Sequence, residues 1–485
     1  DFVDIYLDDS IDSYRTFLKV KSLPRYAIRG RMAVVPDEYA ATLGIDADAE
    51  RAADYVPSQW LFDYQRDIVR TAIQKRKFAI FADCGLGKTP MLLEFARHVR
   101  AVQDKPVLIV SPLMVVKQTM EEAAKFYGDS LPIEQVAAKD LAKWLGAPGG
   151  RLGITNYDAL RDDTPAGDLG GLILDESSML KSHYGKWGQV CLRLGAGVPW
   201  KLALTGTPAP NDRIEYANHA VFLDAFPNVN AFLARFFINR GQTNERWELK
   251  PHALRPFYRA LSHWCIFLTD PSTYGWKDNV HSIPPIHVSI EEVRLSDEQE
   301  RKVRAETGQL FVTELGGITT RSKLSRMAKC ESSPKPQYIA ELVRSWPDES
   351  TLIWCRYNDE QRALEQVLPE AASIDGDTPV EERQRIVDDF KAGRVRVLLS
   401  KPKILGFGLN LQICTRQVFS GLQDSYEEYY QAVKRSNRIG STRPLHVHIP
   451  VSDVERPMVE NVLRKARRVE ADTREQEAMF RDAAE

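Results

Sequence analysis

The stretch that decides the fold is Phe78-Ala-Ile-Phe-Ala-Asp-Cys-Gly-Leu-Gly-Lys-Thr89. Its first five residues form a continuous run of apolar, branched and aromatic side chains, which is typical of a short buried strand. Gly85 and Gly87 then allow a tight turn that brings backbone N–H groups inward, and residues 91–96 begin a helical pattern. Strand, glycine turn, Lys-Thr and helix together predict a cradle for nucleotide phosphates.

The residues of this cradle have distinct expected tasks. The backbone amides and the positive end of the helix hold the phosphates. Lys88 is expected to reach the β and γ oxygens, and the Thr89 hydroxyl to bind Mg²⁺. Ala82 stands where the pattern G-x-x-x-x-G-K-[ST] has its first glycine. The alternative is an ordinary strand–turn–helix with a surface lysine, but the strand and helix on either side of the turn favour a nucleotide site.

Composition is that of a soluble globular protein of several domains. A chain of 485 residues has room for about two to four domains. The residues are 43% hydrophobic and 27% charged, which is ordinary for folded domains. Because the formal net charge is only -2, a nucleic-acid partner would have to be bound by a local basic groove.

Cysteine usage and hydropathy bear on the compartment. The six cysteines are scattered without a C-x-x-C pair, which argues against a zinc site and a disulfide framework and fits a reducing environment. No run of about eighteen apolar residues occurs, so no membrane span is expected. Residues 1–6 lack the basic start and apolar middle of a signal peptide. We therefore expect a cytoplasmic location.

Further apolar runs, separated by helical patterns, predict a parallel α/β sheet around the cradle. They are residues 106–110, 151–155, 171–174, 201–204 and 265–268. Ligands bind beyond the carboxyl ends of strands in open α/β sheets. Three polar segments follow these runs and should converge near the phosphates, namely Ser111-Pro112, Asp175-Glu176 and Thr205-Gly-Thr-Pro208.

Asp175 and Glu176 carry the clearest chemistry after the cradle. An acidic residue at the end of a buried strand can hold Mg²⁺ through its water shell. Glu176 is placed to orient or deprotonate the water that attacks the γ-phosphate. Alone, the pair would suit a helix start equally well, but beside a phosphate cradle the catalytic interpretation is favoured. Gln65, on a predicted helix just upstream, has a side-chain amide that can read the edge of adenine.

A second α/β pattern begins near residue 351 and has no cradle of its own. Arg435 and Arg438 lie three residues apart on a predicted helix and would share one face. Such arginines can act on a γ-phosphate held by another domain, with a rate effect of about 10³ to 10⁵. Without the first half of the chain they would be interpreted as surface charge. The basic stretch 301–329 suits a phosphate track and a solvated helix face equally.

The ordered set of motifs resembles the superfamily two helicases and translocases, and most closely the Swi/Snf-like ATPases. The likeness spans about residues 55–465. Matching stretches are Tyr64-Gln65, 82–89, 108–113, 154–158, 174–178, 204–211, 351–355, Ser400, 406–411 and 431–440. The forms Leu-Thr-Gly-Thr-Pro and Gly-Leu-Asn-Leu favour the Swi/Snf-like branch over the DEAD-box RNA helicases. A short segment between residues 211 and 351 points to a compact bacterial or phage member.

The resemblance implies an α/β fold with two RecA-like P-loop NTPase lobes, each with a parallel sheet, a small N-terminal module and a helical insertion. Its expected domains are an N-terminal module of unknown role (1–52), an ATP-binding lobe (53–280), a lobe with arginine fingers (281–465) and a charged C-terminal helix (466–485). The aromatic-rich segment 222–237 is expected to form the insertion, and residues 282–286 a linker.

The resemblance also implies ATP and Mg²⁺ as cofactors and a role for each motif residue. Nucleotide-binding residues would be Gln65, Gly85, Gly87, Lys88 and Thr89, with Thr89 and Asp175 on Mg²⁺. Catalytic residues would be Lys88, Asp175, Glu176, Arg435 and Arg438. Nucleic-acid contacts would come from Ser111, Pro112, Thr155, Asn156, Arg356 and Ser400, and coupling from Thr205 and Thr207. Ser177-Ser178 stand where the family usually has Ala-His or Ala-Asp.

The activity implied is that of an ATP-dependent translocase that moves along or remodels duplex DNA. Two alternatives remain open. A single-strand-tracking DNA or RNA helicase shares every catalytic residue. A DNA-binding regulator switched by ATP would keep Lys88 and Thr89 but would need neither Glu176 nor Arg435.

Overall fold

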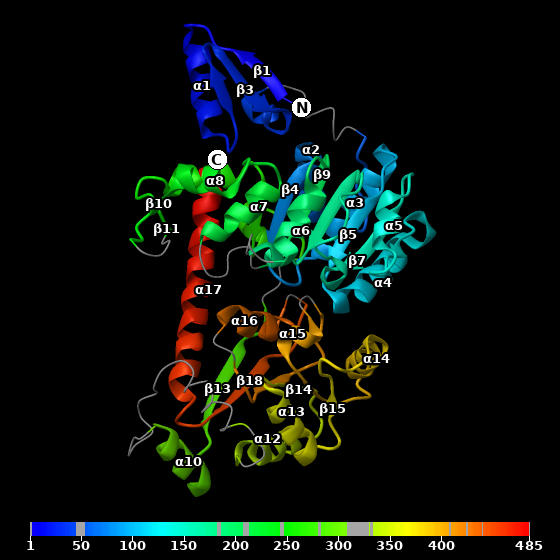
Figure 1. Ribbon diagram of the computed structural model, residues 1–485, viewed down its shortest axis with the longest axis vertical. Coiled ribbons are helices and arrows are strands. Elements are labelled where there is room, and N and C mark those ends of the chain that lie inside the picture. Colours follow the sequence, from blue (N-terminus) through cyan, green and yellow to red (C-terminus); the bar gives the residue numbers. More distant parts are fainter. Residues whose placement is uncertain are drawn as a thin grey trace. The chain divides into compact units, whose positions relative to one another are not determined.

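The computed structural model divides the chain into two compact units (Figure 1). Unit 1 comprises Asp1–Val280 and Asp472–Glu485, and unit 2 comprises His281–Ala471. The structure describes residues 2–44, 54–181, 186–206, 213–242, 247–279, 283–307, 329, 333–406, 409–422, 425–438 and 440–484. None of the described helices is long and apolar enough to cross a membrane.

Unit 1 is built on a seven-stranded sheet in the order β12-β4-β9-β8-β5-β7-β6, with every neighbouring pair parallel. Its strands are β4 (Lys77–Ala82), β5 (Val107–Ser111), β6 (Glu134–Gln135), β7 (Leu152–Asn156), β8 (Gly171–Asp175), β9 (Trp200–Leu204) and β12 (Cys265–Leu268). β4 lies inside the sheet because its apolar side chains are buried on both faces. The sequence predicted every strand except β6, whose two exposed residues carry no hydrophobic pattern.

Helices flank this sheet and form the predicted insertion. They are α2 (Asp63–Lys75), α3 (Lys88–Val102), α4 (Val116–Tyr127), α5 (Leu141–Gly146), α6 (Lys186–Gly195), α7 (Tyr216–Phe222), α8 (Val229–Phe236) and α9 (Leu254–Leu261). The insertion contains α7, α8, α9 and the hairpin of β10 (Phe237–Asn239) with β11 (Trp247–Leu249). Its aromatic rings meet edge-on around Phe257 and belong to the core of unit 1. The expected insertion is confirmed, and burial of these rings fixes it to the sheet.

The N-terminal module is a small antiparallel sheet, β1-β3-β2, with one helix. Its elements are β1 (Phe2–Tyr6), α1 (Ile11–Ser22), β2 (Ala27–Arg29) and β3 (Met32–Pro36). A tight turn at Gly30, whose φ is 59°, joins the last two strands, since glycine adopts this conformation without strain. The module has its own small core, which includes Val20, Val35 and Tyr39.

Unit 2 contains a six-stranded parallel sheet in the order β13-β18-β17-β14-β16-β15. Its strands are β13 (Ile286–Glu292), β14 (Thr351–Trp354), β15 (Ala372–Ser373), β16 (Val397–Ser400), β17 (Arg416–Phe419) and β18 (Leu445–Val451). Its helices are α10 (Asp297–Thr307), α12 (Lys335–Arg344), α13 (Asn358–Val367), α14 (Val380–Lys391), α15 (Pro402–Leu405) and α16 (Tyr426–Lys434). Two parallel α/β sheets confirm the fold expected from the resemblance. Strand β13 was not predicted, because its side chains are mostly exposed and it is held by pairing with β18.

The last helix, α17 (Arg456–Ala484), follows β18 and is longer than the expected 466–485. Its final turns belong to unit 1, where Phe480 packs against Phe267 with ring centroids 5.0 Å apart. Arg481 donates from Nη1 to the Thr273 carbonyl at 2.8 Å. These contacts bury the end of a helix that its charged sequence alone would leave in solvent.

A buried ionic trio lies in unit 2 beside β18. Glu455 accepts hydrogen bonds from Lys335 at 2.8 and 2.9 Å and pairs with Lys329 at 2.8 Å. All three side chains are buried. Burial alone would raise the pKa of Glu455, but the two ammonium groups lower it to about 2. Burial lowers the pKa of Lys335. Because two ammonium groups surround one carboxylate, the charged form of Glu455 is the one that is stabilised. Lys329, one of the basic residues considered for a phosphate track, is therefore not on the surface.

We expect this trio to make unit 2 sensitive to acid. The pKa of Glu455 lies near 2 when folded and 4.5 for the ordinary side chain, so its stabilisation is full above pH 4.5 and is lost as the pH falls toward 2. The free energy involved is roughly 3 kcal/mol. In urea unfolding, Glu455→Gln should be destabilised at pH 7, and its difference from wild type should shrink below about pH 4.5.

The matched control for this experiment is Glu370→Gln. Glu370 pairs with Arg344 in the same unit, but both side chains are more than two fifths exposed, so its loss should change stability by under about 1 kcal/mol. A Glu455→Gln protein as stable as wild type at pH 7 would contradict the assignment.

Candidate nucleotide site

The loop between β4 and α3 forms the predicted cradle. Gly85 and Gly87 have φ angles of 87° and 77°, in the left-handed region that glycine favours. Gly87 caps the helix, so α3 begins at Lys88. A Cβ atom on Gly87 would lie 2.1 Å from Nε2 of Gln65. Glycine is therefore required at position 87 both by the backbone angle and by the close approach of a side chain.

Lys88 lies at the centre of this loop. Its Nζ donates a hydrogen bond of 2.9 Å to the Ala82 carbonyl, and the side chain is partly exposed. Thr89 follows in the first turn of α3. Backbone N–H groups at the start of a 15-residue helix, with an ammonium group beside them, fit the phosphates of a nucleotide.

The end of β9 approaches the same loop. A Cβ atom on Gly206 would lie 3.4 Å from the Ala82 carbonyl oxygen and 3.9 Å from Lys88 Nζ. Thr205 is buried, and its N–H donates to the Ile80 carbonyl of β4 at 3.2 Å. The structure thus brings Thr205 beside the cradle, while Thr207 lies outside the described residues.

The acidic pair lies at the end of β8, next to β5. Ser111 Oγ donates to Asp175 Oδ2 at 3.3 Å, and Asp175 and Glu176 are each 4% exposed. Burial and the neighbouring Glu176 carboxylate raise the pKa of Asp175 to about 7, against the lowering effect of Lys88. Two adjoining buried carboxylates favour a bound cation. Together with the Thr89 hydroxyl they fit Mg²⁺, which takes one or two protein carboxylates plus phosphate oxygens and water.

Glu176 has a backbone conformation rare for its residue type. Its φ is 50°, in the left-handed region, where a non-glycine residue is strained by on the order of 1–3 kcal/mol. Three hydrogen bonds fix the turn around it: Tyr157 Oη donates to the Asp175 carbonyl at 2.7 Å, the Glu176 N–H donates to Asp175 Oδ1 at 3.0 Å, and Ser177 Oγ bonds His219 Nε2 at 2.8 Å. Neither Tyr157 nor His219 was predicted as a support of this turn. Tyr157 lies in the matching stretch 154–158 but had no role assigned to it, and His219 lies outside the matching stretches.

Gln65 and Tyr64 pack against the cradle from α2. Gln65 is only 3% exposed. Its Oε1 accepts from the Phe62 N–H at 3.0 Å, and its Nε2 donates to the Leu86 carbonyl at 3.3 Å. Tyr64 Oη donates to the same carbonyl at 2.7 Å and accepts from Asn279 Nδ2 at 3.1 Å. Gln65 therefore lies beside the cradle, and its amide bonds the cradle loop. Tyr64 bonds the same loop and was not singled out from the sequence.

The cradle helix α3 is anchored by Glu94, a buried carboxylate on its inner face. Glu94 accepts hydrogen bonds from the Ser58 N–H at 3.0 Å, from Tyr127 Oη at 2.5 Å and from Arg97 Nη2 at 2.7 Å. Burial would raise the pKa of Glu94, but the bonds from Arg97, Tyr127 and Ser58 outweigh it and lower the pKa. The carboxylate stays charged and ties the segment before α2 to α3 and α4.

The residues expected to touch nucleic acid are divided between interior and surface. Four have buried side chains, namely Ser111, Pro112, Thr155 and Ser400. Thr155 Oγ1 donates to the Val136 carbonyl at 2.8 Å, and Ser400 Oγ donates to the Ile374 carbonyl at 2.9 Å. Only their main chain is left for a ligand. Asn156 and Arg356 are partly exposed, and the Arg356 guanidinium lies 5.2 Å from the Tyr357 ring centroid.

The two arginines of unit 2 do not share a helix face. Helix α16 ends at Lys434 and Arg435 is its cap, so the expectation of one helical face is wrong. The Ser441 side chain accepts from the Arg438 N–H at 3.1 Å and donates to the Ser436 carbonyl at 2.9 Å. These bonds take up backbone groups that a longer helix would need, which is how serine ends helices.

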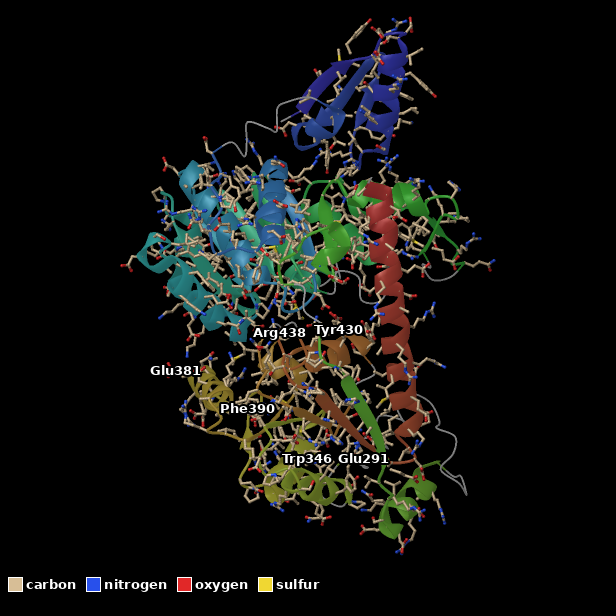
Figure 2. All side chains as sticks on the ribbon, turned by 180° about the vertical axis from the view of Figure 1, so that it is seen from behind. Glu291, Trp346, Glu381, Phe390, Tyr430 and Arg438 are labelled. Carbon is tan, nitrogen blue, oxygen red and sulfur yellow. The ribbon has the colours of Figure 1, made fainter. Side chains whose placement is uncertain are left out.

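The same two arginines differ in burial. Arg435 is 2% exposed. Its Nη2 donates to the carbonyls of Pro402, at 2.8 Å, and Gly406, and its guanidinium lies 5.0 Å from the Trp354 ring centroid. Arg438 is partly exposed and is labelled in Figure 2. The Arg435 guanidinium is therefore bonded inside unit 2. Of the two arginines, Arg438 has the more exposed side chain.

Known proteins align with most of this chain. It is similar to protein p41 of Acyrthosiphon pisum secondary endosymbiont phage 1, with 22% identity over 79% of this chain and 91% of the phage protein. It is also similar to the DNA annealing helicase and endonuclease ZRANB3 of Mus musculus, with 23% identity over 82% of this chain and 40% of that protein. Zorya protein ZorD of Escherichia coli is 25% identical over 79% of this chain and 41% of its own length. The chain thus spans about two fifths of ZRANB3 and ZorD.

A solved structure and two families also match. The Sulfolobus solfataricus SWI2/SNF2 ATPase core in complex with dsDNA has a TM-score of 0.40 and 20% identity, and covers 81% of this chain and 88% of its own. The Helicase conserved C-terminal domain family matches residues 334–440. The SNF2-related domain family matches residues 59–337, which is more than half of the 485 residues and includes both the cradle and the acidic pair. This chain belongs to the SNF2-related family.

Proposed function

We propose that this chain is an ATP-dependent DNA translocase of the Swi/Snf type, which hydrolyses ATP to move along or remodel duplex DNA. One observation carries the proposal: the Lys88 cradle and the buried Asp175-Glu176 pair lie at the carboxyl ends of β4 and β8, two parallel strands of one sheet with β9 between them, in a chain of the SNF2-related family. Relatives named as DNA annealing helicases support DNA as the partner. We place the protein in the cytoplasm, where both ATP and DNA are present in a bacterial or phage-infected cell.

The residues of unit 1 divide the work of hydrolysis. Lys88 would leave the Ala82 carbonyl and bind the β and γ oxygens of ATP. Thr89 and Asp175 would hold Mg²⁺, which supplies positive charge to the transferring phosphoryl group. Glu176 would accept a proton from the attacking water, so that the O–P bond to ADP breaks as the bond to water forms. The products are ADP and inorganic phosphate.

The remaining assignments rest on the motif positions. We assign residues 53–280 to ATP binding and 281–465 to the lobe that supplies an arginine finger, with Arg438 as that finger. Gln65 would lie beside the adenine, and Thr205 and Thr207 would couple hydrolysis to movement. Asn156 and Arg356 would contact DNA phosphates through their exposed side chains, since phosphate contacts position a duplex without reading its sequence.

The test is the steady-state ATPase rate with no nucleic acid, duplex DNA, single-stranded DNA and RNA at one salt concentration. Salt is fixed because phosphate contacts make binding depend steeply on ionic strength. We expect the largest stimulation with duplex DNA. Stimulation by single strands or RNA alone would replace the translocase with a strand-tracking helicase. ATP binding without any stimulation would indicate an ATP-switched DNA-binding regulator.

A further inference from the structure

The strained turn at Glu176 is fixed from two other elements of unit 1. On one side, Tyr157 holds the Asp175 carbonyl at 2.7 Å. On the other side, Ser177, which directly follows Glu176, is completely buried and bonds His219 Nε2 at 2.8 Å. A left-handed glutamate persists only where its surroundings hold it. The direction of the Glu176 carboxylate therefore depends on these two contacts.

His219 is a buried histidine in apolar surroundings. It lies on α7, is completely buried, and meets the Phe81 ring edge-on at 5.1 Å. Its Nδ1 has no hydrogen-bond partner among the described residues. Burial lowers the pKa of His219 to about 3, so the ring is neutral at physiological pH. An apolar side chain of similar volume would fill this space without leaving a polar atom unpaired, which means that packing alone does not account for a histidine here.

We propose that His219 is a positioning residue for ATP hydrolysis, which holds Ser177 and through it the backbone turn that aims Glu176. This inference rests on the proposed ATPase function and deepens it. His219 need not touch the acidic pair to have this role. Its ring bonds the Ser177 hydroxyl, and Ser177 directly follows Glu176 in the backbone. Misplacement of a reacting group by about 1 Å is enough to reduce a rate about 10²-fold, so a single lost hydrogen bond at this turn can be measured.

Four single variants of the full chain test the inference. His219→Leu keeps the volume and removes the hydrogen bond, and Ser177→Ala removes the other partner with little change in packing. His219→Gln can place an amide nitrogen near the position of Nε2. The matched control is His263→Leu, since His263 is another buried histidine of unit 1 but meets Tyr39 of the N-terminal module, with ring centroids 5.8 Å apart. DNA-stimulated kcat, KM for ATP and the thermal unfolding midpoint are measured for each.

We expect kcat to fall about 10- to 100-fold in His219→Leu and in Ser177→Ala, with KM for ATP within about twofold of wild type. The double variant should be no slower than either single one, because the two residues act through one bond. His219→Gln should recover most of the rate, and His263→Leu should keep the wild-type kcat. In a Glu176→Gln background, His219→Leu should cause no further loss.

Three results would overturn the inference: wild-type kcat in both His219→Leu and Ser177→Ala, additive losses in the double variant, or the same fold loss in the Glu176→Gln background. If His219→Leu does not fold, the inference is tested by Ser177→Ala alone and by Ser177→Ala in the Glu176→Gln background. A wild-type protein that binds ATP but never hydrolyses it would remove the proposed function itself, and this inference with it. An active wild type with unaffected variants would remove the inference alone.

Discussion

An ATPase rate lower by about 10² to 10³-fold is expected for Lys88→Ala, measured at saturating duplex DNA. Lys88 carries an ammonium group at the start of α3, close enough to act on the charge of Asp175, and its side chain is partly exposed. In the free protein its Nζ donates to the Ala82 carbonyl, and its charge lowers the pKa of Asp175. Its removal should therefore affect charge stabilisation of the transferring phosphoryl group far more than folding.

Two comparisons make this first prediction specific. Lys105→Ala is the control, because Lys105 belongs to the same unit but forms an exposed pair with Asp168, and its ATPase rate should be unchanged. The thermal unfolding midpoint of Lys88→Ala should stay near that of wild type, since the hydrogen bond to the Ala82 carbonyl contributes only about 1 kcal/mol. Full ATPase activity in Lys88→Ala would contradict the assignment of the cradle.

The second large effect is expected from Arg438→Ala, with a loss of about 10³-fold or more in the DNA-stimulated ATPase rate and an unchanged unfolding midpoint. Arg438 is partly exposed, and it is its backbone N–H that bonds Ser441. A finger needs a guanidinium that can leave its own domain and reach a developing charge. Arg438→Lys should restore only part of the rate, because an ammonium group cannot reproduce the planar fork.

Arg435→Ala is the informative comparison, because Arg435 lies three residues before Arg438 in the same motif but in a different environment. It is buried and bonds two backbone carbonyls. Its removal should lower the free energy of unfolding of unit 2 by about 2–4 kcal/mol, through the unpaired carbonyls and the space left over Trp354. The two roles would be exchanged if Arg435→Ala kept its stability and lost the ATPase rate, while Arg438→Ala lost stability and kept the rate.

The sequence was most informative where the residues that form a structure are adjacent along the chain. The apolar run, the two glycines and Lys88 predicted β4, the left-handed turn and the first residue of α3, and each is present. Strand β8 ended at the expected acidic residue for the same reason, since a continuous buried run is readable without its neighbours. Where the hydrophobic signal was weaker, as in the mostly exposed β13, no strand was predicted.

The motifs did not distinguish a buried polar residue from an exposed one. Thr155, Ser400 and Arg435 match stretches with assigned tasks, yet each is bonded inside its unit. Burial depends on which elements pack together, and hydrogen-bond partners such as Val136 and Ile374 come from other strands and loops. A side chain that can accept or donate is therefore recognisable in the sequence, but its availability to a ligand is not.

By itself the sequence determined the two α/β patterns, the phosphate cradle and the acidic pair, because these depend on residues adjacent along the chain. Only the tertiary structure decided which residues support them. Tyr157 and His219 fix the strained turn at Glu176 from 18 and 42 residues away, and Tyr64 supports the cradle from 22 residues away. The physical reason is that strain at a catalytic residue is balanced by contacts from whatever packs against it, and such contacts leave no periodic pattern in the sequence.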